Sequence, residues 1–257
     1  MSEYKKLKYY FDEELGMMLA KKIKPHYPKF QSKAFIKDIK LSVGNLELKQ
    51  RVEIISDGLF HHLPSNFCTA LDILGKILGP ENPKETGMFT EGYWLMPIAF
   101  YVEKYGLKNY KESMQFIEEV TKRNTGEYAI RPFLLARPEK TLEIAKKWSK
   151  NKNSHVRRLA SEGLRPRLPW AKKITIFSQD PTPVFLVLEN MISDSSAYVR
   201  KSVANNLADF LKENYEDTIS FIEKWKSNAS SETLWVIKHA LRNEIKKNNP
   251  VAIRLIK

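Results

Sequence analysis

The feature that most constrains the fold is a ten-residue pattern that occurs twice in the second half of the chain. HVRRLASEGL at 155–164 aligns with YVRKSVANNL at 198–207, an offset of 43 residues, so that Arg157 matches Arg200. A third, related segment, LWVIKHALRNEI, follows at 234–245. Repetition at a period of about 35–45 residues is typical of stacked two-helix units, in which no unit buries its apolar face alone. The pattern therefore predicts a repeat protein.

Apolar residues recur at helical spacing along the whole chain, and strict period-two alternation bounded by turn residues is almost absent. These features predict an all-α protein of the HEAT-like type, a superhelix of paired helices with a concave basic face. We expect one domain over 1–257, with an N-terminal helical region at 1–80 and paired repeats at 91–257. The helices are expected at 9–23, 35–41, 46–60, 67–78, 93–105, 127–135, 140–148, 155–163, 170–177, 198–211, 217–225 and 234–245, with a terminal stretch after the last of these.

The most unusual stretch is SHVRRLASEGLRPRLPWAKK at 154–173, where a single acid, Glu162, lies among six Arg and Lys. Its first half predicts a short helix capped by Ser154, whose buried stripe is Val156, Leu159, Ala160 and Gly163. Arg157, Arg158, Ser161 and Glu162 should then face away from the core. Two prolines prevent the helix from continuing, because each removes an N–H donor and favours an extended predecessor. Trp170 is expected to begin the next helix.

Overall charge favours a polyanionic partner. The chain has 43 Lys and Arg against 30 Asp and Glu, a formal net charge of +13, which indicates nucleic acid first and an anionic membrane second. No window approaches the 18 or so apolar residues of a membrane span, and the amino terminus lacks an apolar signal region. We therefore expect a soluble, cytoplasmic protein that acts in the nucleoid and makes no membrane contact.

Basic residues recur at comparable positions of successive repeats, and more follow in the connection after Gly163. Aligned in this way they should form a stripe that holds phosphates without reading base sequence. Each of them singly could instead be an ordinary solvated charge. The expected DNA-binding residues are Arg157, Arg158, Arg165, Arg167, Lys172, Lys173, Arg200, Lys201, Lys238 and Arg242.

Several classes of site have no support in the sequence. The single cysteine, Cys68, rules out an internal disulfide and a cysteine-based zinc cluster. The five histidines show no HExxH or comparable spacing, and neither a glycine-rich phosphate loop nor a GxSxG motif is present. We therefore expect no metal and no cofactor.

Four segments together carry a family resemblance: GEYAIRPFL at 126–134, HVRRLASEGLRPRLPWA at 155–171, VRKSVANNLADF at 199–210 and LWVIKHALR at 234–242. With them the chain resembles the HEAT-repeat DNA glycosylases of the AlkC/AlkD alkylation-repair family, and within it the AlkC branch. Weaker similarity at 11–23 and 46–64 extends the resemblance over most of the chain. Because no strand-rich tail follows, the resemblance implies the short form without an immunoglobulin-like domain.

The resemblance implies a monofunctional enzyme that cleaves the N-glycosidic bond of cationic alkylated bases in double-stranded DNA, chiefly 3-methyladenine and also 3-methylcytosine. The leaving group is already good, so the enzyme need only stabilise an oxocarbenium-like sugar and place a water, as in glycoside hydrolysis. Carboxylates and an aromatic face suit that task. Carried over by motif, the catalytic candidates are Glu127, Glu162, Trp170 and Asp209.

Each candidate also has an ordinary structural interpretation. Glu162 could pair with Arg158, four residues earlier on the same helix. Asp209 could be a surface acid beside Lys212. Glu127 could complement a helix dipole, and Trp170 could fill the core, as Trp148, Trp225 and Trp235 are expected to do.

Two alternative functions also stay open. The first is a DNA-binding scaffold that kept the basic groove but lost turnover. The second is a HEAT-type adaptor that docks an acidic protein. The glycosylase interpretation itself needs no obligate protein partner and predicts a monomer.

Overall fold

The computed structural model describes residues 5–86 and 92–257 of the 257-residue chain. Within these ranges the chain forms 14 α helices and three short 3-10 helices, and no strand. The predicted all-α, helical-repeat fold is confirmed. None of the helices in the described ranges has the length and the apolar character that a membrane span needs. The chain divides into two compact units, Met1–Pro132 and Phe133–Lys257. The expected division into 1–80 and 91–257 stays a prediction.

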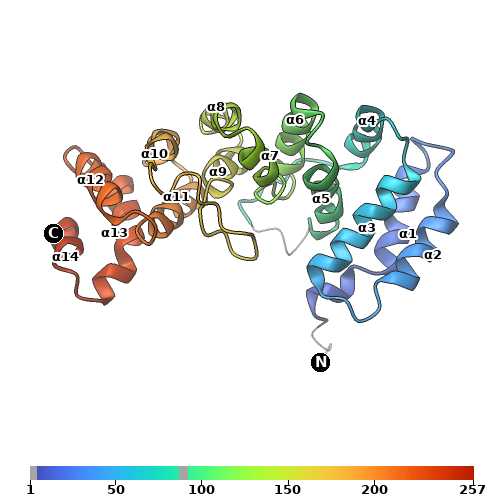
Figure 1. Cartoon of the computed structure of the whole chain (residues 1–257), viewed down its shortest axis with the longest axis horizontal. Helices are drawn as coiled ribbons and strands as arrows, with labels where there is room; N and C mark the ends of the chain where they lie inside the picture. The colour runs from blue at the N-terminus through green and yellow to red at the C-terminus, as the bar shows by residue number, and fades with distance from the viewer. Residues whose placement is uncertain (1–4, 87–91) are drawn as a thin grey trace. The chain divides into compact units, whose positions relative to one another are not determined.

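In the first unit some neighbouring helices in the chain pack together, such as α1 with α2 and α5 with α6, and others pack on helices further along (Figure 1). Helices α2, α3 and α5 pack side by side, and α4 contacts both α1 and α6. Each helix turns an apolar stripe toward this double layer, as with Phe35 and Ile39 of α2, which are fully buried. The elements are η1 (Leu7–Tyr10), α1 (Glu13–Ile23), α2 (Ser32–Ser42), α3 (Leu48–His62), α4 (Phe67–Ile77), η2 (Tyr93–Leu95), α5 (Met96–Tyr105) and α6 (Tyr110–Thr121).

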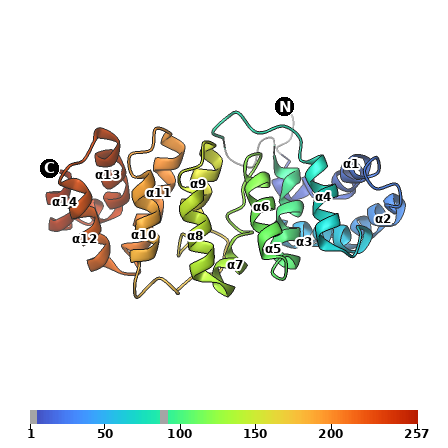
Figure 2. The same cartoon turned by 90° about the horizontal axis from the view of Figure 1, so that it is seen from above.

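The second unit stacks its helices in two layers (Figure 2). Helix α11 packs between α9 and α13 in one layer, while α8 contacts α10 in the other and α12 packs against α13. The short helix α7 (Arg131–Ala136) spans the boundary between the units. The remaining elements are α8 (Pro138–Trp148), α9 (Ser154–Glu162), α10 (Thr182–Leu188), η3 (Glu189–Met191), α11 (Ala197–Phe210), α12 (Tyr215–Lys226), α13 (Ser231–Lys246) and α14 (Pro250–Ile256).

Most predicted helices are present to within a few residues, and α6 and α10 were not expected. The helix expected at 170–177 does not form, so that prediction is wrong. This segment belongs to a long connection between α9 and α10, which projects as an open loop in Figure 1. Trp170 has a φ of +61°, in the left-handed region that a right-handed helix cannot use. The next helix begins only at Thr182, after Pro181.

The start of α9 also differs from expectation. Asn153, rather than Ser154, is the N-cap, and its side-chain oxygen accepts a hydrogen bond of 2.9 Å from the His155 amide. The predicted apolar stripe is confirmed, since Val156, Leu159 and Ala160 are at most 1% exposed. The helix therefore begins at Ser154, one residue earlier than the cap prediction implied.

Candidate active site

Glu162 is the last residue of α9 and is only 5% exposed. The sequence placed it and Ser161 away from the core, and this is wrong, because α11 packs along α9 and covers both residues. Asp209, near the end of α11, is likewise only 6% exposed. Two of the candidate carboxylates are thus buried at corresponding ends of neighbouring helices.

Arg165 joins these two carboxylates. Its Nη1 donates to Oε1 of Glu162 at 2.7 Å, and its Nε donates to Oδ2 of Asp209 at 2.8 Å. The guanidinium of Arg158 lies 3.7 Å from the same Glu162 oxygen, so the expected i,i+4 pair exists but is longer than the bond from Arg165. Arg165 and Arg158 were expected to contact DNA. We name Glu162, Arg165 and Asp209 the carboxylate–arginine centre.

The two carboxylates of this centre have opposite pKa shifts. Burial works against ionisation of Glu162, but Arg158, Arg165 and Ser202 outweigh it and lower the pKa of that carboxyl. For Asp209, burial is the larger effect, and despite Arg165 and Lys212 the pKa lies above its ordinary value. A rigidly held Glu162 carboxylate therefore neighbours an Asp209 that is more easily protonated.

The two acids also differ in which oxygens are engaged. Both oxygens of Glu162 accept a hydrogen bond, because the Ser202 hydroxyl donates to Oε2 at 2.6 Å. Asp209 accepts through Oδ2 from Arg165, and its Oδ1 accepts no hydrogen bond from the residues that the structure describes. Oδ1 of Asp209 is the oxygen able to accept a bond from a water or to face a developing positive charge. Sequence reasoning missed Ser202, because it lies 40 residues from Glu162 in the chain and no motif links the two.

Trp170 lies on the loop between α9 and α10, and 74% of its surface is exposed, so it is not a core residue. The loop is nonetheless anchored. Leu168 and Ile174 are buried, and the Ile174 amide donates to the Pro166 carbonyl at 3.0 Å. A left-handed backbone at a tryptophan costs about 1–2 kcal/mol, which these contacts offset. The indole is therefore presented by an ordered loop.

Glu213 holds this loop to the connection after α11. Its side chain accepts from Arg167 and lies 2.6 Å from Nζ of Lys173. These bonds outweigh the effect of burial and lower the pKa of Glu213. Two cations expected to contact DNA thus flank Trp170 and help to fix its loop, and Lys172 beside them is exposed. Nothing in the sequence analysis singled out Glu213.

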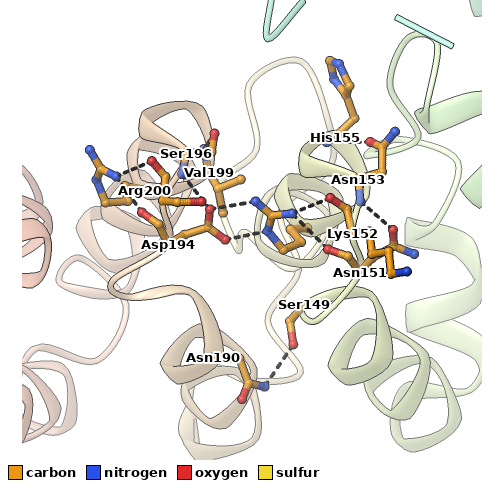
Figure 3. A network of polar contacts seen from close by, with 12 residues as sticks. Ser149, Asn151, Lys152, Asn153, His155, Asn190, Asp194, Ser196, Val199 and Arg200 are labelled. Atoms are coloured by element: carbon orange, nitrogen blue, oxygen red, sulfur yellow. Dashed lines mark hydrogen bonds and ion pairs between the residues drawn. The ribbon is translucent and has the colours of Figure 1, made fainter. Parts of the chain in front are cut away.

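Arg157, which was expected to lie in the DNA-binding stripe, bonds to neighbouring groups of the protein. Its guanidinium donates to both oxygens of Asp194 at 2.6 and 2.9 Å and also to the carbonyls of Asn151 and Lys152. Arg200, its repeat equivalent, bonds the carbonyls of Asp194 and Ser195 in the same way (Figure 3). The repeated arginine therefore ties each helix to the loop that precedes it.

On α13, Trp235 is exposed although the sequence predicted a core position, so that prediction is wrong. Trp235 is 42% exposed, its ring stacks on His239 at 4.9 Å, and the Arg200 guanidinium lies 5.9 Å from the indole. The prediction for Trp148 and Trp225 is confirmed, since both are buried. Lys201 and Lys238 are exposed here, while Arg242 donates to Asn205 at 3.0 Å.

Glu127 belongs to the first unit, where it lies in the turn before α7 and is 3% exposed. The hydroxyl of Thr125 donates to its carboxylate. Gly126 lets the turn approach α6, because a Cβ there would lie 2.6 Å from the Thr121 hydroxyl and 2.8 Å from Ile117. Glu127 is therefore a buried carboxylate fixed by its own turn.

No group of three or more His, Cys, Asp or Glu suited to a metal ion occurs in residues 5–86 and 92–257. Fold and site together define an α-helical repeat protein with a buried carboxylate–arginine centre beside a loop that exposes tryptophan and cations.

Comparison with known proteins identifies this class. A family model described as DNA alkylation repair enzyme matches residues 104–243. The protein YhaZ of Bacillus subtilis strain 168, itself uncharacterised, is 39% identical over 250 residues, covering 97% of this chain and 67% of YhaZ. The solved structure of the Pseudomonas fluorescens alkylpurine DNA glycosylase AlkC, bound to DNA containing an abasic site analogue, is similar with a TM-score of 0.88. It is 36% identical, covering 99% of this chain and 69% of that one. The chain belongs to the DNA alkylation repair enzyme family.

Proposed function

We propose that the protein is a DNA glycosylase that hydrolyses the N-glycosidic bond of cationic N-alkylated bases, chiefly 3-methyladenine and secondarily 3-methylcytosine. The observation that carries the proposal is the buried carboxylate–arginine centre in a chain that matches a DNA-bound alkylpurine glycosylase over 99% of its length. We further propose that the protein acts on double-stranded DNA as a monomer, without a metal or other cofactor.

The chemistry assigns different roles to the two acids. Loss of a cationic base leaves an oxocarbenium-like sugar, which a nearby carboxylate stabilises. Asp209 offers Oδ1 toward the sugar or an attacking water, while Oδ2 is held by Arg165. Glu162 supplies fixed negative charge from the end of α9. We assign Asp209 as the residue closest to the reaction and Glu162 as its electrostatic partner.

Trp170 is proposed to contact the alkylated base. An indole face attracts a cation with about 0.5–2 kcal/mol, depending on how far the site is desolvated. The anchored loop keeps the exposed ring in one place, so that little conformational entropy is lost on binding. Glu127 is proposed as a further catalytic carboxylate, on the grounds of the resemblance and of its burial.

Exposed cations are proposed to hold the phosphates. Lys172, Lys201 and Lys238 are exposed, and Arg167 and Lys173 flank Trp170. Each phosphate contact adds a salt-dependent increment to DNA affinity without selecting a base sequence. Arg157 and Arg165 are excluded from this set, because their side chains are only 16% and 11% exposed and pair with buried carboxylates. The side chains of Arg167 and Lys173 also pair with a carboxylate but remain 44% and 45% exposed.

Single-turnover base release tests the proposal. Duplex DNA treated with dimethyl sulfate is incubated with excess protein, and the free bases are separated by chromatography. We expect release of 3-methyladenine and formation of abasic sites, without cleavage of the DNA strand. Salt-sensitive DNA binding without release of any methylated base would contradict the proposal and favour a non-catalytic scaffold. Failure to bind duplex DNA at all would favour a protein-interaction adaptor.

A further inference from the structure

The α9–α11 seam contains a line of polar side chains that the catalytic assignment leaves unused. The Ser202 hydroxyl lies 2.6 Å from Oε2 of Glu162 and 3.0 Å from the hydroxyl of Ser161. The Nδ2 of Asn206 donates to the Ser161 carbonyl at 2.7 Å. All four residues are at most 5% exposed. The line therefore runs through the interior, away from bulk water.

The direction of the hydrogen bonds follows from the number of protons available. A serine hydroxyl has one proton to donate and two lone pairs that accept. Ser202 donates to the Glu162 carboxylate, its shorter and charge-assisted bond. The 3.0 Å contact between the two hydroxyls also has Ser202 as its donor, so the Ser161 oxygen is a second acceptor beside the same proton. Ser161, Ser202 and Glu162 form a line of two hydroxyls that ends on a carboxylate, which we name the serine relay.

Repeat packing alone does not require these polar groups. At the positions 43 residues further on, Ala204 stands in place of Ser161 and Asn205 in place of Glu162. Helices α11 and α13 thus pack against each other without such a relay, although they are neighbours in the stack in the same way as α9 and α11.

The seam also carries a cost. Oδ1 of Asn206 is buried without a hydrogen-bond partner, and an unsatisfied buried acceptor costs about 1–3 kcal/mol. The polar residues of this seam thus hold Glu162 in place at a cost in stability.

We propose that Ser202 and Ser161 are positioning residues, which act through Glu162 to hold its carboxylate in one orientation and in its ionised form. The inference rests on the proposed glycosylase function and assigns new residues to that site. Neither serine touches the substrate. The relay fixes Oε2 of Glu162, while Arg165 fixes Oε1.

The charged groups that face Glu162 set the expected pH behaviour. Arg158 on its own helix and Arg165 on the following loop favour its charge, and Asp209 on α11 opposes it. The Ser202 bond also favours the charged form. Removal of that hydroxyl therefore raises the pKa of Glu162, and the acidic limb of the reaction should move to higher pH.

The test compares single-turnover release of 3-methyladenine from methylated duplex DNA between about pH 5 and pH 8.5 for Ser202→Ala, Ser202→Thr and the wild type. We expect Ser202→Ala to lower the rate about tenfold. Its acidic limb should lie at higher pH and its Kd for DNA should not change. Ser202→Thr, which keeps the hydroxyl, should restore both rate and limb. The matched control is Ser113→Ala, which removes a fully buried hydroxyl bonded to the Gly106 carbonyl in the first unit. It should leave the pH profile unchanged.

Circular dichroism establishes that each variant is folded, and Ser161→Ala carries the test if Ser202→Ala is not. That variant removes the hydroxyl that helps to hold the Ser202 side chain in place, and it should move the limb in the same direction by a smaller amount. A folded Ser202→Ala with the rate and acidic limb of the wild type would overturn the inference while the proposed function stands. A wild type that releases no base would instead overturn the proposed function on which the inference rests.

Discussion

At the scale of single residues, the carboxylate–arginine centre is a problem of charge balance. Glu162 and Asp209 are both buried, and Arg165 lies between them with Arg158 nearby, so two carboxylates face two guanidiniums. Such a group is tolerated in the interior only while it stays complete, because removing one partner leaves a buried charge uncompensated, at about 3–5 kcal/mol. The ionised acids that the proposed chemistry needs therefore depend on Arg165.

Arg165→Gln should destabilise the protein in a pH-dependent manner. At neutral pH we expect the free energy of unfolding to fall by about 3 kcal/mol. Arg165 lowers the folded-state pKa values of both Glu162 and Asp209, so its removal should raise both relative to the wild type. A carboxyl whose folded pKa rises loses less stability on protonation, so the deficit of the variant should shrink as the pH falls toward about 5. Urea unfolding followed by circular dichroism at the two pH values measures this.

Arg167→Gln is the control for this charge removal, because the Arg167 side chain is 44% exposed and Lys173 remains to pair with Glu213. A surface pair contributes about 0–1 kcal/mol, so this variant should change stability little at either pH. An Arg165→Gln variant as stable as the wild type, or equally destabilised at both pH values, would contradict the account of the centre.

The acids of the centre were predictable and their partners were not. Glu162 and Asp209 follow from the motif resemblance. Arg165 was expected to contact DNA. Its position in the sequence does not indicate that Asp209, on another helix, would be its partner once the helices pack. Ser202 was missed for the same reason, since its bond to Glu162 exists only once α11 lies on α9.

At the scale of elements, the repeat is held together by its arginines. Arg157 and Arg200 each bond two carbonyls of the loop that precedes their helix, and Arg157 adds both oxygens of Asp194. Asp194 in turn accepts from the Ser196 amide at the start of α11. The motif that predicts the repeat is thus also the device that orders it, and this explains why the two segments share an arginine.

Arg157→Gln should therefore reduce stability rather than DNA affinity. We expect a loss of about 3 kcal/mol in the free energy of unfolding, since Asp194 loses its buried partner. Lys201→Gln, an exposed position on α11, should change stability by no more than about 0.5 kcal/mol and weaken DNA binding in low salt. Urea titration and fluorescence anisotropy with a labelled duplex separate the two effects. An Arg157→Gln variant with wild-type stability and weakened DNA binding would contradict this and indicate that Arg157 contacts DNA.

The loop between α9 and α10 marks the limit of pattern reasoning at this scale. Apolar residues from Trp170 to Phe177 have helical spacing, yet the segment is irregular, because Trp170 is left-handed and Leu168 and Ile174 bury themselves individually. Period alone cannot distinguish a short helix from a loop whose apolar residues happen to fit. Its anchor, Glu213, lies 35 or more residues away in sequence from its partners on the loop.

Glu213→Gln should loosen this loop without unfolding the helices around it. Loss of the charge weakens the bonds from Arg167 and Lys173, which lower the pKa of Glu213. We expect faster proteolytic cleavage near Trp170 and a base-release rate reduced about threefold or more, because the indole is less well positioned. Glu216→Gln, an exposed glutamate one turn away in sequence, is the matched control. Equal proteolysis of both variants would show that Glu213 does not anchor the loop.

At the scale of the whole molecule, each unit contains candidate residues of its own. Glu127 belongs to the first unit, and Glu162, Trp170 and Asp209 belong to the second. Composition predicted the kind of partner, since a net charge of +13 suits DNA, and the repeat period predicted the fold. Neither could reveal which cations pair with carboxylates inside the protein. Arg157 and Arg165, both expected to contact DNA, form such internal pairs.

The measurement that tests the account most directly is single-turnover release of 3-methyladenine from methylated duplex DNA by Asp209→Asn and the wild type. The account predicts a rate at least about tenfold lower in the variant, equivalent to about 1.4 kcal/mol of transition-state stabilisation. The amide keeps the shape of the carboxyl, and Arg165 keeps its bond to Glu162, so the variant should still fold, which circular dichroism checks. A folded Asp209→Asn that releases the base as fast as the wild type would contradict the assignment of the reaction to the carboxylate–arginine centre.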